Sequence, residues 1–237
     1  MPLVAAAVLP HPPLLVPEIA AGAAPELDDL RVACDEAVGR VLAAEPAVVC
    51  VVGSAETTTE HRFPYRASFA AWGVPVQAHL GEPAADAPGL PLSVAVGVWL
   101  LCRRRRAAGS TTWRVITVDV AMPTLECGQF GARLSGAASV GLLVMGDGSA
   151  CRNLNAPGYV DPRAEPFDSS VTKALATVDL AALRDLDPGL AAELLVAGRA
   201  PWQVLAGAAA GASLTGELHY DRAPYGVQYT VASWISA

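Results

Sequence analysis

The chain has 237 residues, of which 53% are hydrophobic and 16% charged, and it carries a formal net charge of −7 at pH 7. This length and composition predict a globular protein with enough apolar side chains to bury a sizeable core. The acidic balance excludes a typical nucleic-acid-binding surface, because phosphate binding depends on clustered Lys and Arg, and the one basic run, residues 103–106, is short.

The sequence also argues against a membrane or secreted protein. The apolar segment at residues 90–102 is shorter than the roughly 20 residues that a membrane span needs, so we expect a buried helix there. No positive charge precedes Arg31, and prolines interrupt the first residues, which excludes a signal peptide. The cysteines are odd in number and widely spaced: Cys34, Cys50, Cys102, Cys127 and Cys151. We therefore expect buried thiols, no zinc site and a cytoplasmic protein.

Apolar runs of strand length alternate with helical patterns. Strands are predicted at residues 3–9, 47–53, 74–80, 113–120 and 139–147, and helices at 25–44, 92–106 and 125–134. After a polar loop, residues 168–211 predict helices broken at Asp187-Pro188 and Ala200-Pro201, and strand-like runs at 214–220 and 226–234 end the chain. Continuous apolar strands alternating with helices predict one α/β domain, residues 1–237, with three α/β/α layers and a largely parallel or mixed central sheet.

Four loops follow strands at the edge where ligands gather in such sheets: residues 10–13, 53–61, 146–153 and 219–226. They hold three of the four histidines and several acids, namely His11, Glu56, His61, Asp147, His219 and Asp221, and with them Ser149. Imidazole nitrogens and carboxylate oxygens on converging loops suit a divalent metal ion, although this spacing is not diagnostic.

Some of these residues also have a structural interpretation. His11 can be a loop histidine satisfied by its neighbours, and Asp147 beside glycine can close a turn. Ser149 or Cys151 could serve a hydrolase as nucleophile, but "GDGSA" does not match the G-x-S-x-G elbow. Arg152 can meet a substrate carboxylate or lie solvated on the surface.

Several segments together resemble the LigB-like superfamily of class III extradiol ring-cleavage dioxygenases, whose fold the Memo-type proteins share. They are "PHPPLLVPE" near the start, "VMGDGSACR", residues 159–209, and "APYGVQYTVASW" near the end, so the resemblance spans nearly the whole chain. It implies a central sheet between helical layers, with a non-haem Fe(II) held by two His and one Glu at the carboxyl ends of the strands.

The resemblance assigns positions in this chain to that iron site. His11 matches the first ligand, and prolines on both sides would hold its ring at a strand end. The second histidine ligand falls on Ala55, or on Glu56 after a shift of one residue. The glutamate ligand falls on Asp221 or on Arg222.

The acid/base histidine of the family falls on Ala150. An alanine there removes proton transfer that commonly contributes roughly 10²–10⁴ in rate. The metal site that the resemblance implies is therefore altered in this chain.

Two functions from different classes follow from the resemblance. The first is Fe(II)-dependent ring cleavage of a catecholic substrate, with another divalent metal or none as alternatives. Its expected site consists of metal ligands His11, Glu56, His219 and Asp221, with Asp147 and Ser149 as catalytic candidates beside them. The second is a catalytically inactive, Memo-like protein that binds a small molecule or a partner protein. The expected ligand is a small aromatic or planar acid; we expect no nucleic acid or membrane partner, and a homodimer fits the family.

Overall fold

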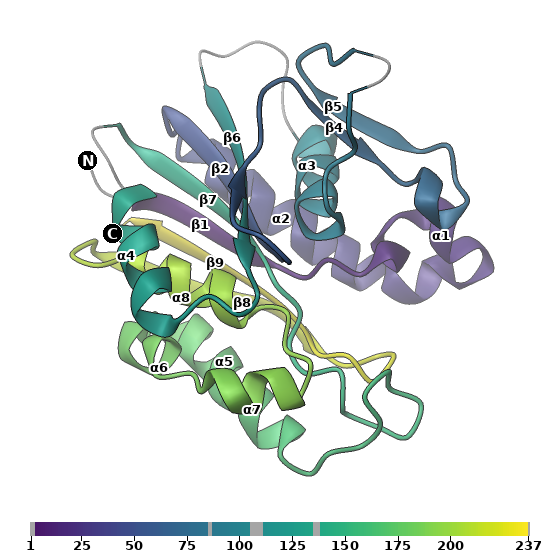
Figure 1. The fold of residues 1–237 in the computed structure, drawn as a ribbon, viewed down its shortest axis with the longest axis vertical. Helices are drawn as coiled ribbons and strands as arrows, with labels where there is room; N and C mark the ends of the chain where they lie inside the picture. Colours follow the sequence, from purple (N-terminus) through teal and green to yellow (C-terminus); the bar gives the residue numbers. More distant parts are fainter. Residues whose placement is uncertain (1–2, 85–86, 105–110, 135–137, 237) are drawn as a thin grey trace.

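A computed structural model describes residues 3–84, 87–104, 111–134 and 138–236 (Figure 1). Its strands are β1 (Leu3–Leu9), β2 (Val48–Ala55), β3 (Thr59–Glu60), β4 (Tyr65–Ser68), β5 (Gln77–Leu80), β6 (Thr112–Asp119), β7 (Val140–Met145), β8 (Leu214–Arg222) and β9 (Tyr229–Ser236). Its α-helices are α1 (Pro17–Ala20), α2 (Asp28–Ala43), α3 (Leu92–Arg104), α4 (Thr124–Leu134), α5 (Ala164–Thr177), α6 (Leu180–Arg184), α7 (Pro188–Glu193) and α8 (Arg199–Ala208).

Seven strands form the central sheet in the order β3-β6-β2-β7-β1-β9-β8. The four strands β6, β2, β7 and β1 run parallel, whereas β3, β9 and β8 pair antiparallel with their neighbours. The inner parallel strands are continuous apolar runs because both faces of the sheet are covered. The predicted α/β fold with a mixed central sheet is confirmed.

The two faces of the sheet have separate apolar cores. Along β1, Ala5, Ala7 and Leu9 pack with α2 and α3, whereas Ala6 and Val8 pack with the face that α4 to α8 cover. Side chains of a strand alternate between faces, so one apolar strand serves both cores. Figure 1 shows α2 and α3 on one side of the sheet and α4 to α8 on the other, which gives the three expected layers.

Several predicted elements differ from the structure in detail. The strand predicted at residues 74–80 is β5, which pairs with β4 in a separate two-stranded sheet. The predicted helix at 25–44 begins only at Asp28, after a 3-10 helix (Ala21–Leu27). The last two residues of the helix predicted at 92–106 lie outside the described residues.

Of the two predicted helix breaks, one is confirmed and one is wrong. Asp187 caps α7 by accepting a hydrogen bond from the Leu190 N–H, and Pro188 begins the helix. No break separates Ala200 from Pro201, because α8 begins at Arg199 and Pro201 lies in its first turn. A proline is tolerated there, since the first N–H groups of a helix have no partner within it.

None of the helices in the described ranges is both long and apolar enough to cross a membrane. All five cysteines are free, Cys102 being half-buried and the other four buried.

Candidate functional site

His11 and Asp147 meet where the neighbouring strands β1 and β7 end. The end of β1 is joined to the start of the loop after β7 by a 2.8 Å hydrogen bond from the Gly146 N–H to the carbonyl oxygen of Leu9. Asp147 Oδ1 accepts the backbone N–H of His11 at 2.8 Å and lies 3.7 Å from His11 Nδ1. That ring nitrogen is buried and has no hydrogen-bond partner among the described residues. The structure thus brings together two of the predicted site residues, with Asp147 holding the His11 loop in place.

Ser149 is fully buried under this edge of the sheet. Its backbone N–H and its hydroxyl donate to the two carboxylate oxygens of Asp168 on α5, at 2.8 and 2.5 Å. Because the hydroxyl is inaccessible and already bonded, Ser149 anchors the loop, and the prediction of a catalytic role for it is corrected.

Arg152 extends this buried network. Its guanidinium donates to Asp168 at 3.2 Å and to Gln228 Oε1 at 2.9 Å, so it is engaged with the protein. Burial raises the pKa of Asp168, and the hydrogen bonds from Ser149 and Arg152 partly offset that rise.

Asp221 belongs to the same network. Its Oδ1 accepts hydrogen bonds from Gln228 Nε2 at 2.5 Å and from Thr172 Oγ1 of α5 at 3.0 Å. Asp221 therefore faces α5.

His219 faces the opposite side of the sheet. Its Nε2 lies 2.8 Å from Ser233 Oγ, and its Nδ1 lies 3.9 Å from a carboxylate oxygen of Glu36 on α2 and of Glu217 on β8. Within the described ranges, these three are the one group of His, Cys, Asp or Glu whose ligand atoms all lie within 4.8 Å of one another. Arg40 already pairs with both carboxylates.

The four predicted metal ligands do not form one site. Residues two apart in a regular strand share a face, but the pairing of β8 with β9 shifts between Leu218 and Tyr220. His219 and Asp221 consequently face α2 and α5, on opposite sides of the sheet, and cannot hold the same ion. Glu56 is exposed and belongs to no such group. The predicted four-ligand site is therefore corrected.

The Fe(II) centre implied by the LigB-like resemblance needs three protein ligands. At the His11 edge the structure offers the His11 ring and the Asp147 carboxylate, and no third His, Cys, Asp or Glu of the described residues completes a group there. The side chains of Ala55 and Ala150, at two of the implied positions, offer no donor atom for a metal. The residues present do not fit that iron centre.

The sequence analysis also placed His61 at this edge of the sheet, and in the structure it contacts Thr117 of β6. Its Nε2 lies 3.3 Å from Thr117 Oγ1, and burial lowers the pKa of the imidazole.

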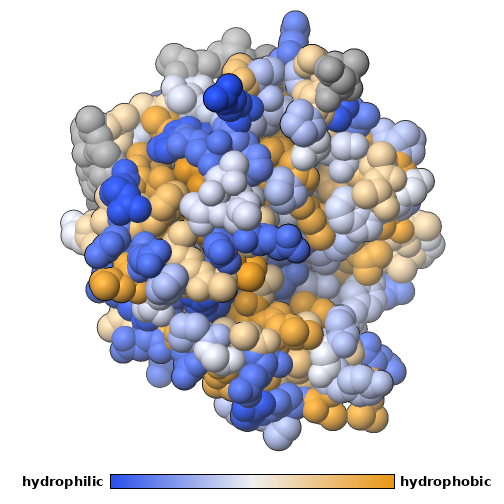
Figure 2. Space-filling view, in the orientation of Figure 1, coloured by the Kyte–Doolittle hydropathy of each residue, from blue (hydrophilic) through white to orange (hydrophobic). Residues whose placement is uncertain are grey.

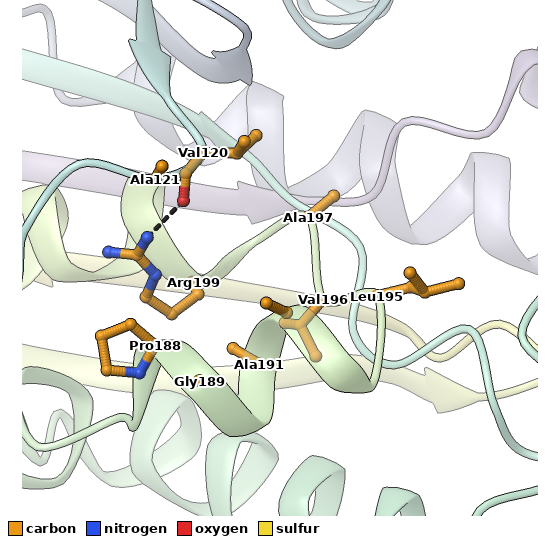
Figure 3. A pocket seen from close by; sticks show the side chains of 10 residues that line it. Val120, Ala121, Pro188, Gly189, Ala191, Leu195, Val196, Ala197 and Arg199 are labelled. Carbon is orange, nitrogen blue, oxygen red and sulfur yellow. Dashed lines mark hydrogen bonds between the residues drawn. The ribbon is translucent and has the colours of Figure 1, made fainter.

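An apolar cavity of about 570 Å³ opens beside the end of β6. Residues 120–121 form one wall, and residues 188–199 of α7 and the start of α8 form the other, as Figure 3 shows. Val120 and Leu195 in these walls are each 51% exposed. Figure 2 shows apolar surface interleaved with polar surface on this face of the molecule. Exposed apolar walls of this kind are typical of a surface that a ligand covers.

The cavity wall is bonded to the loop that carries Asp147. The Gly198 N–H donates to the carbonyl oxygen of Asp147 at 2.9 Å, and the Ala150 N–H donates to that of Leu194 at 3.0 Å. A Cβ on Gly146 would overlap the Cα of Gly198, so glycine is needed for this close approach. The cavity wall and the His11–Asp147 pair are thus joined by backbone hydrogen bonds and close packing.

Arg199 lines the cavity and is 3% exposed. Its guanidinium donates to the carbonyl oxygens of Val120 and Met122 and to Gln203 Oε1 (Figure 3 draws the bond to Val120). The sequence analysis missed this residue, although a single charge in the apolar stretch at residues 194–210 was an available signal.

Asp168 was also missed. It follows the helical spacing of Val171 and Leu175, which are buried in the core. An acid on the apolar stripe of a helix needs a buried partner, and that pattern could have singled it out.

The fold and this edge define an α/β protein with a mixed sheet between two helical layers and a ligand-sized cavity at the carboxyl end of a parallel strand. A scan against known families finds no matching family model, and a search of curated proteins finds no match. Among solved structures, the chain is similar to an uncharacterized protein, JW3007, from Escherichia coli K12. The TM-score is 0.52 at 18% sequence identity, and the match covers 98% of this chain and 100% of that one. This likeness concerns the fold alone.

Proposed function

We propose that this protein binds a small, largely apolar molecule in the cavity beside the end of β6, on a LigB-like scaffold that does not hold a ring-cleaving iron. The cavity carries the proposal. Its volume of about 570 Å³ suits a small organic ligand, and it lies outside the carboxyl ends of the strands, where open α/β sheets bind ligands.

Ring cleavage through Fe(II) is the competing function, and the metal-ligand atoms available at the His11 edge argue against it. His11 and Asp147 supply two side chains where three are needed, and Ala150 replaces the acid/base histidine that the family resemblance implies. The remaining predicted ligands face other parts of the molecule. The binding function needs none of these donors.

The LigB-like ancestry and a cytoplasmic location belong to the same proposal. The three-layer fold and the position of His11, two residues after the end of β1, support the ancestry. Five free cysteines support a reducing compartment, because no disulfide contributes to this fold.

Binding of Nile red, a neutral apolar dye, to the full-length protein tests the proposal. We expect saturable binding with one dye per chain. Ala192→Trp should abolish it, because Ala192 is an exposed residue of the cavity wall, where an indole would occupy the space. Ala181→Trp, at an exposed position of α6, is the matched control and should leave binding intact. Equal dye binding by wild type and Ala192→Trp would refute the proposed site.

Metal binding tests the competing function separately. Protein reconstituted anaerobically with Fe(II) should retain less than about 0.1 iron per chain after desalting and should not consume oxygen with catechol. Stoichiometric iron that is lost in His11→Ala, together with oxygen uptake, would restore the dioxygenase function and overturn the proposal.

A further inference from the structure

The ligand class follows from the charge that lines the cavity. The described residues include two buried arginines, Arg31 and Arg199. Arg31 forms an ion pair with Asp28 at 2.6 Å. Arg199 makes no ion pair with any described residue, and its partners are two carbonyl oxygens, the Gln203 amide oxygen and, at 3.7 Å, the Cys127 sulfur.

A buried guanidinium without a counter-charge is unusual. Carbonyl and amide dipoles satisfy its N–H groups but leave its net charge in a poorly solvated place, and buried charges in proteins are normally paired. The charge of Arg199 borders a cavity that is otherwise apolar. An anion in that cavity would supply the missing partner.

The start of α8 adds to the positive electrostatic potential in the cavity. Arg199 is the first residue of this ten-residue helix, so the positive end of the helix dipole lies at the cavity wall. A cation at a helix N-terminus is unfavourable and an anion is favourable. Two independent features, a buried cation and a helix N-terminus, thus select the same sign of ligand charge.

The walls define the rest of the ligand. Pro188, Leu195 and Val196 on one side and Val120 on the other offer apolar contact, and Figure 3 shows the Arg199 side chain between these two walls. We infer that the cavity binds a small organic anion, an aromatic or otherwise apolar body with one carboxylate, through Arg199. This inference rests on the proposed function and names the ligand class of the same site.

Three probes of one shape test the inference on the full-length protein. They are 1-naphthoate, the neutral 1-naphthamide and the cationic 1-naphthylmethylamine, each titrated calorimetrically at pH 7. We expect 1-naphthoate to bind at least tenfold more tightly than 1-naphthamide, and the amine to bind more weakly than both. Since the attraction is ionic, the ratio of the affinities for 1-naphthoate and 1-naphthamide should decrease in high salt.

Variants of the protein test whether Arg199 supplies the charge that favours the anionic probe. Arg199→Gln should remove the preference for 1-naphthoate over 1-naphthamide while leaving the amide affinity within about threefold. Because Arg199 also holds the turn at residues 120–122, its folding is checked by circular dichroism. If that variant does not fold, Ala192→Trp should abolish naphthoate binding and Ala181→Trp should not.

The outcomes separate this inference from the proposed function. Equal binding of naphthoate and naphthamide, both blocked by Ala192→Trp, would overturn the anion inference and leave the cavity as a binding site. Naphthoate binding that survives Ala192→Trp would overturn the inference by placing the anion elsewhere. If the wild-type protein binds neither Nile red nor any of the three naphthalene probes, both the proposed function and the anion inference are overturned.

Discussion

At the scale of single residues, Asp168 is the residue on which the loop after β7 depends. It is 2% exposed and accepts three hydrogen bonds, two from Ser149 and one from Arg152. Asp168→Ala would leave the buried N–H and hydroxyl of Ser149 and the guanidinium of Arg152 without their carboxylate partner. We expect the free energy of unfolding to fall by about 2–4 kcal/mol, measured by urea denaturation at pH 7.

Glu165→Ala is the matched control for that measurement. Glu165 lies on the same helix and also approaches Arg152, at 3.6 Å, but its side chain is 75% exposed. An exposed ion pair contributes at most about 1 kcal/mol. Similar losses for both variants would contradict the view that burial makes Asp168 important.

His61 gives a prediction for pH. Burial lowers its pKa below the ordinary value of 6.5, so the unfolded chain binds a proton more readily than the folded chain does. As the pH falls through about 6.5, this group should therefore reduce the stability of the wild type, whereas above that pH it contributes nothing. The stability of wild type relative to His61→Gln should decrease between about pH 7.5 and pH 5.5 in urea titrations.

His79→Gln serves as the control for removing a histidine. His79 is exposed on β5, and the effect of His61 is the excess over this variant. A wild-type stability that rises relative to His61→Gln on acidification would show that the folded protein favours the charged imidazole.

Part of this site could be predicted because the ends of buried strands can be recognised in the sequence. His11 and Asp147 each follow a continuous apolar run, and adjacent parallel strands bring such positions to one edge. It could not predict the separation of His219 from Asp221, because that separation comes from an irregularity inside β8. Arg199 could have been noticed as the single charge in an apolar stretch, but two of its partners are backbone carbonyls of residues 120 and 122, which no residue pattern reveals.

At the scale of elements, the close packing of α4 against α8 depends on glycine. A Cβ on Gly131 would overlap the carbonyl oxygen of Val204 and lie 2.8 Å from the Ala208 nitrogen. These are backbone atoms of another helix, so the helices would have to separate. Gly131→Ala should therefore destabilise the protein by about 1–3 kcal/mol in thermal or urea unfolding.

Gly128→Ala on the same helix tests whether the clash is responsible. A Cβ on Gly128 meets nothing within 4 Å, so the substitution should stabilise α4 by up to about 1 kcal/mol through helix propensity. Opposite signs for the two variants are expected. A loss of stability in both would mean that any substitution in α4 is harmful.

Elements were predicted where one physical signal dominated. The central strands were found because a strand buried on both faces is apolar throughout, and the helix break at Asp187 was found because a capping residue precedes a proline. The pairing of β4 with β5 was missed because it joins residues 65–68 to 77–80 across a 3-10 helix (Ala70–Trp72), where the polar and apolar pattern is short. Interpreting Pro201 as a break failed because a proline inside a first turn and a proline that ends a helix look alike in sequence.

At the scale of the whole molecule, the fold should not depend on a metal ion. Each face of the sheet has its own apolar core, and Asp168, Arg152 and Gln228 at the carboxyl edge are joined by hydrogen bonds to one another. A structural metal would add its binding free energy to folding, so its removal would lower the melting temperature. We expect incubation with EDTA at pH 7 to change the melting temperature by less than about 1 °C, a shift well below the effect of 1 kcal/mol in a domain of this size.

A larger fall would show a metal bound in the folded state, and two variants would locate it. If His219→Ala removes the EDTA effect and His11→Ala does not, the ion lies between α2 and β8, where His219 faces Glu36 and Glu217. If His11→Ala alone removes it, the ion lies at the carboxyl edge, and the proposed loss of the iron site would be wrong. Because His219 and His11 lie on separate elements and contact different carboxylates, each variant can report on one location without disturbing the other.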